Sequence, residues 1–257
     1  MRGPTLIYPS TSDCFGSGSV NGPRPGSDGL SSLTPRLARV AAHEHVNTLD
    51  DEAFAELYGA WAGRTPPDAA ALMHGYPGTW WVAGGWALEA FTGVARDHED
   101  LDFVVLRSDL PLLRRHLAGR LHVWTATAGA LCPLLPEDDP DGAADDLLPA
   151  GCGQVWTRRS AADPWEYDIL LDPGHADEWI CKRDPEIRLP MASAVWRRHG
   201  VSYLMPEVQL LLKAKGDRAK DRADLDAALP LLDADRRRWL AAGIERMLPG
   251  HPWLARL

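Results

Sequence analysis

Two acidic residues stand two positions apart at the start of an apolar segment. Asp100 and Asp102 open a stretch whose remainder, 103–106, is entirely apolar. Residues two apart in a β-strand point to the same face, so the two carboxylates are expected side by side. Such a pair destabilises a fold unless a cation offsets it, and hard carboxylate oxygens suit magnesium. The spacing therefore predicts a Mg²⁺ site, against the alternative that the pair only decorates the exposed start of a strand.

A glycine pair precedes these acids. Gly84 and Gly85 follow an apolar strand and lead at once into a helix, fifteen residues ahead of Asp100. Glycines let a backbone turn tightly and approach a ligand, and the free N–H groups of a helix N-terminus favour phosphate. A glycine pair at a strand end is most often only a turn. The acidic pair downstream shifts the interpretation towards a phosphate-binding turn.

A later strand supplies candidates for a third carboxylate. Asp168 lies within an apolar segment, where a core residue would be expected, and could bind the same metal or act as a general base. Glu166 shares its strand face and Asp172 lies beyond it, so both remain alternatives. We favour Asp168 because apolar residues follow it immediately.

The elements that must position these residues alternate between strands and helices. Apolar patterning predicts strands at 80–83, 101–106, 121–125, 154–157 and 165–171. Helices are predicted at 86–91, after an N-cap at Ser108, and at 50–61, where Phe54, Leu57, Tyr58 and Trp61 share a face. The fold class predicted is α/β (α+β), a mixed β-sheet packed by helices, with an acidic, Pro-rich loop at about 133–149.

The two ends of the chain differ from this α/β region. Residues 1–34 are rich in Gly, Pro and Ser and are expected to form a disordered leader. Residues 35–205 form the predicted α/β domain, in which His43 and His45 are interpreted as structural or exposed. A C-terminal helical subdomain is predicted for 206–257, with helices at 207–215, 220–229 and 233–247, the last capped by Asp233.

Composition narrows the class of protein. The 257 residues are 45% hydrophobic and can bury a sizeable core. The net charge of -9 disfavours a nucleic-acid partner, since phosphate backbones are repelled. The four cysteines contain no C-x-x-C pair, which is typical of reduced thiols in a cytosol. With no membrane-length apolar run and no secretory signal, we expect a cytoplasmic protein.

The motif as a whole resembles a known family. The residues Gly84-Gly85-Trp86-Ala87-Leu88, then Arg96, His98 and Asp100-Leu101-Asp102, resemble the nucleotidyltransferases related to aminoglycoside 2''-adenylyltransferases. The resemblance is concentrated over about 80–106 and extends plausibly to Asp168. It departs from the family at Glu89, where many relatives carry Asp and to which we attach no role.

The resemblance implies a nucleotidyltransferase fold for residues 35–205. It also implies that Gly84 and Gly85 contact a triphosphate, with ATP as co-substrate, and that Asp100, Asp102 and Asp168 bind Mg²⁺ and carry the catalysis. The partners implied are a nucleoside triphosphate and a small hydroxylated acceptor such as an aminoglycoside; the sequence does not indicate an oligomeric state.

Three basic residues keep two interpretations each. Arg96 and His98 could each contact phosphate or brace the loop ahead of the metal strand, and for His98 we favour bracing. Lys220 could reach the phosphates or form a surface pair with Asp224, four residues further along a helix.

Two other functional classes fit parts of the pattern. An Asp-x-Asp pair after an apolar strand also holds metal in sugar-nucleotide glycosyltransferases, but that class does not account for the glycine turn. A non-catalytic relative that binds nucleotide or a protein partner, as an antitoxin does, is the second alternative. The presence of all three acids argues against a degenerate site.

Overall fold

The computed structural model describes residues 51–139 and 141–257. The leader predicted for residues 1–34, Cys14, and the interpretation of His43 and His45 lie outside the described residues. Within the described part of the chain, no helix is long and apolar enough to span a bilayer.

An eight-stranded sheet forms the centre of the molecule, in the order β4-β3-β5-β6-β2-β1-β10-β9. The β1·β10 and β2·β6 pairs are parallel and the other neighbours are antiparallel, so the predicted mixed sheet is confirmed. Its strands are β1 (Trp80–Val82), β2 (Asp102–Leu106), β3 (His122–Thr127), β4 (Ala130–Pro133), β5 (Gln154–Arg158), β6 (Tyr167–Asp172), β9 (Val195–Arg198) and β10 (Val201–Leu204). A separate hairpin pairs β7 (Glu178–Ile180) with β8 (Arg188–Pro190).

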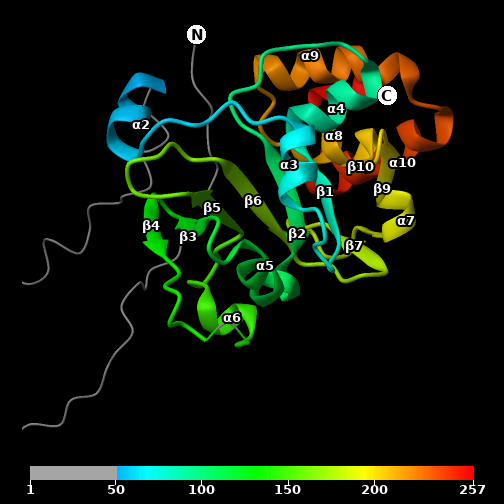
Figure 1. The fold of residues 1–257 in the computed structure, drawn as a ribbon. Helices are drawn as coiled ribbons and strands as arrows, with labels where there is room; N and C mark the ends of the chain where they lie inside the picture. Colours follow the sequence, from blue (N-terminus) through cyan, green and yellow to red (C-terminus); the bar gives the residue numbers. More distant parts are fainter. Residues whose placement is uncertain (1–50, 140) are drawn as a thin grey trace, which may run out of the picture.

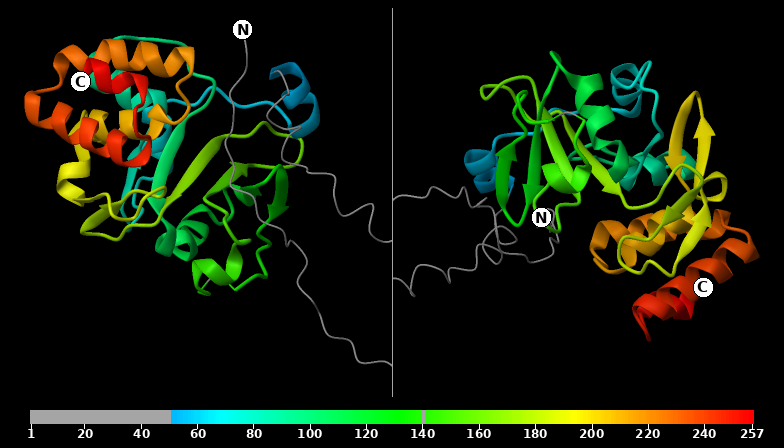
Figure 2. Two further views of the ribbon diagram at one scale, coloured as in Figure 1. Left: turned by 180° about the vertical axis from the view of Figure 1, so that it is seen from behind. Right: turned by 90° about the horizontal axis from the view of Figure 1, so that it is seen from below.

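Helices surround this sheet unevenly. In Figures 1 and 2, the C-terminal helices gather with α4 beside β1 and β10, whereas α2 lies near the opposite end of the sheet. The helices are α2 (Asp51–Tyr58), α3 (Pro66–Leu72), α4 (Gly84–Thr92), α5 (Leu110–Leu117), α6 (Ala144–Leu147), α7 (Met191–Ala194), α8 (Pro206–Ala214), α9 (Ala219–Ala228) and α10 (Ala234–Met247). Short 3-10 helices cover Arg107–Asp109, Leu229–Leu231 and Pro252–Arg256.

Strand alternation separates a core face from a polar face in the middle of the sheet. Phe103 and Val105 of β2 are fully buried on one face, in the same core cluster as the leucines of α5. Asp102 is on the opposite face of the same strand, as the period of two requires. Apolar residues of α8, α9 and α10 join that core cluster, so the C-terminal helices and the sheet share one hydrophobic core.

Most predicted elements are present, with boundaries displaced by one or two residues. The helix predicted at 86–91 begins earlier, at Gly84, and Asp233 caps α10 by accepting a hydrogen bond from the Arg236 N–H. The cap predicted at Ser108 is wrong, because this residue lies inside a 3-10 turn and α5 starts at Leu110.

Two further sequence expectations are corrected. The helix predicted at 50–61 ends at Tyr58, and Trp61 instead forms an isolated parallel bridge with Trp165. Leu57 is 66% exposed, so only part of the expected apolar face packs. Residues 173–205, for which no element was predicted, contain two hairpins. Their strands were not predicted because three or four residues are too few to show a hydrophobic period.

Candidate active site

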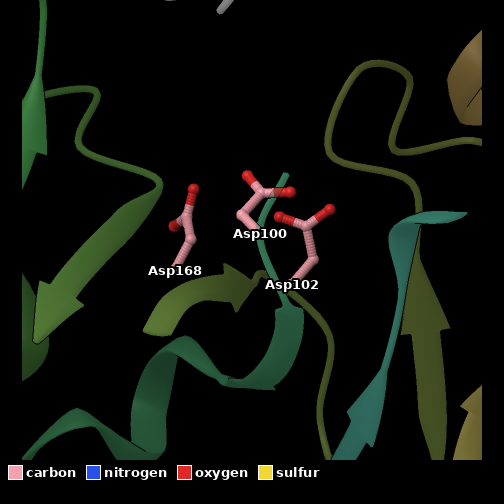
Figure 3. Close-up of side chains that lie close together, drawn as sticks. All are labelled: Asp100, Asp102 and Asp168. Carbon is pink, nitrogen blue, oxygen red and sulfur yellow. The ribbon is translucent and has the colours of Figure 1, made fainter. Parts of the chain in front are cut away.

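Three aspartates converge on the polar face of the sheet. Asp102 and Asp168 are direct partners in the parallel β2·β6 pair, and Asp100 lies just before β2. Their carboxylates point towards one another in Figure 3, and one oxygen from each lies within 4.8 Å of the others. Strands that are distant in the sequence thus bring the predicted acidic pair and the favoured third acid together.

Burial and mutual repulsion between the carboxylates dominate the electrostatics of this cluster. Burial, followed by the charge of Asp102, raises the pKa of Asp100 to about 7. Burial and the two neighbouring carboxylates raise the pKa of Asp168 well above its usual range, and burial raises that of Asp102. Each carboxylate therefore resists ionisation beside the others.

The donor set fits a divalent metal. Within the described part of the chain, the buried Oδ1 of Asp168 accepts no hydrogen bond, whereas its Oδ2 accepts one from Gln154 Nε2 at 3.3 Å. A buried carboxylate oxygen without a partner is costly unless an ion or water satisfies it. Three converging carboxylates offer the hard oxygen ligands that Mg²⁺ prefers.

The two alternative acids are engaged elsewhere. Glu166 is buried and forms ion pairs with Arg64 at 2.8 Å and Arg159 at 2.9 Å. Asp172, at the far end of β6, accepts a hydrogen bond from the Gly174 N–H at 2.8 Å. Neither belongs to the three-carboxylate group, although Asp172 lines the same cavity.

Both glycines of the turn make room for side chains of the site. Gly84 has φ +65°, and a Cβ atom there would lie 2.3 Å from Oδ2 of Asp102. A Cβ atom on Gly85 would lie 1.7 Å from a guanidinium nitrogen of Arg96. The Gly84 N–H donates to Oε1 of Gln209 at 2.9 Å, so α8 holds the start of α4 in place.

The loop before β2 is held by α4. The ring of His98 stacks on Trp86 with a centroid separation of 3.9 Å, and its Nε2 lies 2.7 Å from Oε2 of Glu89. The same Glu89 oxygen accepts the Arg96 N–H. Trp86 Nε1 donates to the Asp100 carbonyl at 3.2 Å, which links this packing to the first acid of the cluster. Glu89, for which no role was predicted, thus contacts both Arg96 and His98 of the loop.

Buried ion pairs join the loop to the C-terminal helices. Arg96 Nε lies 3.1 Å from Asp224, and Lys213 lies 3.0 Å from both Asp221 and Asp224. Arg218 completes the group by pairing with Asp221 at 2.8 Å. We refer to these five residues as the paired network. The geometry therefore gives Arg96 a bracing contact.

Lys220 does not form the surface pair that its spacing suggested. Its Nζ lies 3.2 Å from Glu99, while Asp224 is occupied by Arg96 and Lys213. The i, i+4 expectation is wrong here because buried partners satisfy Asp224 first. Lys220 instead stands at the edge of the acidic cluster, where its charge opposes the rise in the pKa of Asp100.

A cavity of about 320 Å³ contains the acids, the glycine turn and several cations. Many residues that line this cavity were not predicted from the sequence to belong to the site, namely Trp179, Lys182, Arg183, Gln209, Lys213, Arg218 and Asp221. The basic and acidic run at 213–224 was a visible signal, but which of its charges face inwards depends on the packing of α8 against α9. Lys182 and Arg183 follow a strand too short to detect.

Two tryptophans near the site, Trp81 and Trp156, pack in the core. Trp81 is fully buried beneath the cavity. Trp156, the β5 partner of Asp168, packs edge-on against Trp61 and Trp165. Arg158 lies over the ring of Trp165 at 4.2 Å. This aromatic cluster continues the acidic face of the sheet towards β3.

Comparisons with known proteins give only distant likenesses. No protein-family profile and no curated protein matches the chain. Among solved structures, it is similar to the lincosamide antibiotic adenylyltransferase LnuA with lincomycin bound, at 15% identity and a TM-score of 0.43, covering 64% of this chain and 94% of that one.

The antibiotic-resistance factor ANT(2'')-Ia is similar in two structures. Its solution structure gives 17% identity and a TM-score of 0.40 over 68% of this chain and 87% of that one. Its crystal structure with adenylyl-2''-tobramycin gives 16% identity and a TM-score of 0.40 over 68% and 92%. Likenesses at these identities and TM-scores do not establish a function.

Proposed function

We propose that the protein is a Mg²⁺-dependent nucleotidyltransferase that moves AMP from ATP to a hydroxyl of a small acceptor, with aminoglycosides as the first class to test. One observation carries the proposal: the carboxylates of Asp100, Asp102 and Asp168 converge within 4.8 Å beside a glycine turn that opens a helix. The family resemblance of the motif around that turn adds the choice of ATP and of the acceptor class.

The three aspartates would hold the metal. When bound, Mg²⁺ would neutralise the charge of the triphosphate and template its reacting phosphorus. Asp102 and Asp168 come from adjacent strands inside the sheet, which is a rigid support for ligands. Asp100 depends on its loop, and the Trp86 and His98 stack restrains that loop.

Asp168 is the residue that we assign to the acceptor's proton. Its carboxylate is buried among the three acids of the cluster, and a carboxylate held there can accept a proton as a general base. The acceptor oxygen then bonds to the α-phosphorus, the bond from that phosphorus to the bridging oxygen of the β-phosphate breaks, and pyrophosphate leaves. Positioning and charge neutralisation supply most of the acceleration.

Different basic residues receive different roles around the triphosphate. Lys220 is assigned to the phosphates, because its Glu99 partner is about half exposed and such pairs are weak. Arg96 is assigned to bracing because it is committed to Asp224, although its guanidinium stands directly against Gly85. Gly84 admits Asp102, and amides at the start of α4 are assigned to the phosphate charge.

The acceptor and setting follow from charge and thiol content. A net charge of -9 favours a small acceptor over a nucleic acid. The four cysteines are widely spaced and include no C-x-x-C pair, in keeping with a cytoplasmic enzyme supplied with ATP.

The test is acceptor-dependent release of pyrophosphate. The protein is incubated with ATP and Mg²⁺ and a panel that includes an aminoglycoside, a lincosamide and other hydroxylated small molecules. Asp100→Asn should abolish the release, whereas Asp235→Asn, which changes an exposed surface pair, should not. Undiminished Mg²⁺-dependent transfer in Asp100→Asn would falsify the mechanism. Turnover of UDP-sugars instead of ATP would identify a glycosyltransferase.

A further inference from the structure

One lysine in the cavity wall differs from every other cation there. Lysines and arginines line the cavity, and within the described part of the chain Lys182 alone among them has no ion pair or hydrogen bond from its side chain. The others are engaged by protein groups: Arg96 by Asp224, Arg183 by the Leu212 carbonyl, Lys213 by Asp221 and Asp224, Arg218 by Asp221, and Lys220 by Glu99.

The backbone carrying Lys182 is fixed even though its side chain is not. It follows β7, whose Trp179 is buried at the cavity floor, and comes directly after the buried Cys181. The Cys181 N–H donates to the Ile187 carbonyl at 3.0 Å, which closes the turn between β7 and β8. The residue itself is exposed, so the amine can move while its anchor stays in place.

The charge of Lys182 acts on the acidic cluster. It opposes the rise in pKa of Asp102, Asp168 and Asp172, and among the cations acting on Asp168 it is the largest influence. Lys213 and Arg218, although nearer in sequence to the expected phosphate contacts, have their own aspartates to satisfy. Lys182 is therefore the available counter-charge in the cavity wall.

We propose that Lys182 is the counter-ion of the three-aspartate cluster in the nucleotide-free protein and becomes a ligand of the triphosphate when divalent cations enter. The role of Lys182 as a triphosphate ligand rests on the proposed function. Its role as a counter-ion concerns only the metal and the lysine. A positive charge beside the carboxylates lowers their affinity for free cation, so removing it should tighten cation binding. Bound nucleotide supplies the negative charge that draws the amine away.

Two titrations separate these two roles. Mn²⁺ binding is measured by calorimetry at pH 8 without nucleotide, and binding of a non-hydrolysable ATP analogue is measured with saturating Mn²⁺. Lys182→Gln should bind Mn²⁺ about tenfold more tightly and the analogue about tenfold more weakly, as expected for one charge at an intermediate dielectric. Lys182→Arg, which keeps the charge, should stay close to wild type in both.

A matched control lies on the same hairpin. Arg188 belongs to β8, pairs with Glu178 and does not line the cavity, so Arg188→Gln removes one positive charge at a similar exposure. It should leave both affinities unchanged, and thermal melting checks that each variant is folded. Unchanged or absent Mn²⁺ binding in Lys182→Gln, an equal effect of Arg188→Gln, or undiminished analogue binding would overturn the inference. Tighter Mn²⁺ binding in a protein that binds no nucleotide would overturn the role as a triphosphate ligand together with the proposed function, while the role as a counter-ion would stand.

Discussion

Two groups of buried aspartates share one cavity wall and have opposite electrostatics. In the paired network, Asp221 is fully buried yet meets Lys213 at 3.0 Å and Arg218 at 2.8 Å. Although burial alone would raise it, hydrogen bonds from Arg218 and the charge of Lys213 hold its pKa below the usual range. On the sheet, Asp168 is equally inaccessible, meets two further carboxylates, and has a raised pKa.

The difference shows which aspartates serve the fold. A buried carboxylate with matched cations is part of the structure, and breaking such a pair is costly. Three neighbouring carboxylates that form no ion pair with the described residues weaken the folded state and are expected where a site needs a ligand. Asp168 and Asp221 are about equally buried, so the presence of partners, rather than burial, separates the acids of the paired network from those of the candidate site.

The largest effect on activity is expected when an aspartate of the three-aspartate cluster is replaced. Asp168→Asn should lower kcat by about a thousandfold or more, equivalent to about 4 kcal/mol in the barrier, because it removes both a metal ligand and the proposed base. It should raise the melting temperature of the metal-free protein, since like-charge repulsion falls. Steady-state kinetics and calorimetry measure the two effects. A loss of stability that parallels the loss of activity would mean that Asp168 is a structural acid.

The reverse pattern is expected in the paired network. Asp221→Asn leaves Lys213 and Arg218 without their shared partner, and the free energy of unfolding should fall by about 3 kcal/mol. Denaturant titration measures this, with Asp226→Asn as the control, because Asp226 pairs with Arg256 on the surface. If both substitutions lowered the free energy of unfolding equally, the buried ion pairs of Asp221 would be no more stabilising than the surface pair of Asp226.

A smaller effect is expected at the turn that admits Asp102. Gly84→Ala combines backbone strain at φ +65° with a clash against the Asp102 carboxylate, and should lower kcat/KM by about a hundredfold and stability by about 1 to 2 kcal/mol. Gly93→Ala is the matched control, since Gly93 has φ +72° and open space at its Cβ position. That variant should lose comparable stability from strain and keep its activity. If both variants lost activity, backbone strain in α4, rather than the clash with Asp102, would explain the lower kcat/KM of Gly84→Ala.

The smallest effect is a pH dependence of stability. The pKa of Asp100 is raised from 3.8 to about 7, so the folded state binds protons more tightly than the unfolded state and loses stability as pH rises through that interval. In the presence of a chelator, the melting temperature should therefore fall by a few degrees between pH 5 and pH 8. Asp100→Asn should reduce this slope, and Mg²⁺ should restore stability at pH 8. Asp221 has the opposite sign, because its stabilisation is lost only as pH falls below its ordinary value.

Sequence patterns predicted the central part of the fold well because most of its strands, namely β2, β3, β5 and β6, have five or six residues. The strand at β2 and the helix at α4 carry a clear period, and the Asp102 and Asp168 faces followed from alternation. The hairpins between 173 and 205 escaped because three or four residues show no period, and their turns use a left-handed residue such as His199. Partner strands that lie far apart in the sequence, such as β1 and β10, cannot be paired from local pattern alone.

At the site, residue types were predictable but partnerships were not. The three aspartates could be picked out because they lie beside or within apolar strand segments. Whether Lys220 meets Asp224 or Glu99, and whether Asp221 is buried, depends on how α9 packs against α4 and α8. Glu89 illustrates the same limit, since its partners are the loop groups of Arg96 and His98 that fold back on α4.

The pairing of β2 with β6 also has a consequence for folding kinetics. Asp102 and Asp168 are adjacent in the sheet, but α5 and the strands β3, β4 and β5 lie between them in the chain. Closing so long a loop has a large entropic cost, which contacts formed early cannot offset. The proposed metal site should therefore form only near the end of refolding, and stopped-flow measurement of Mn²⁺ uptake would report the last step of assembly of the sheet.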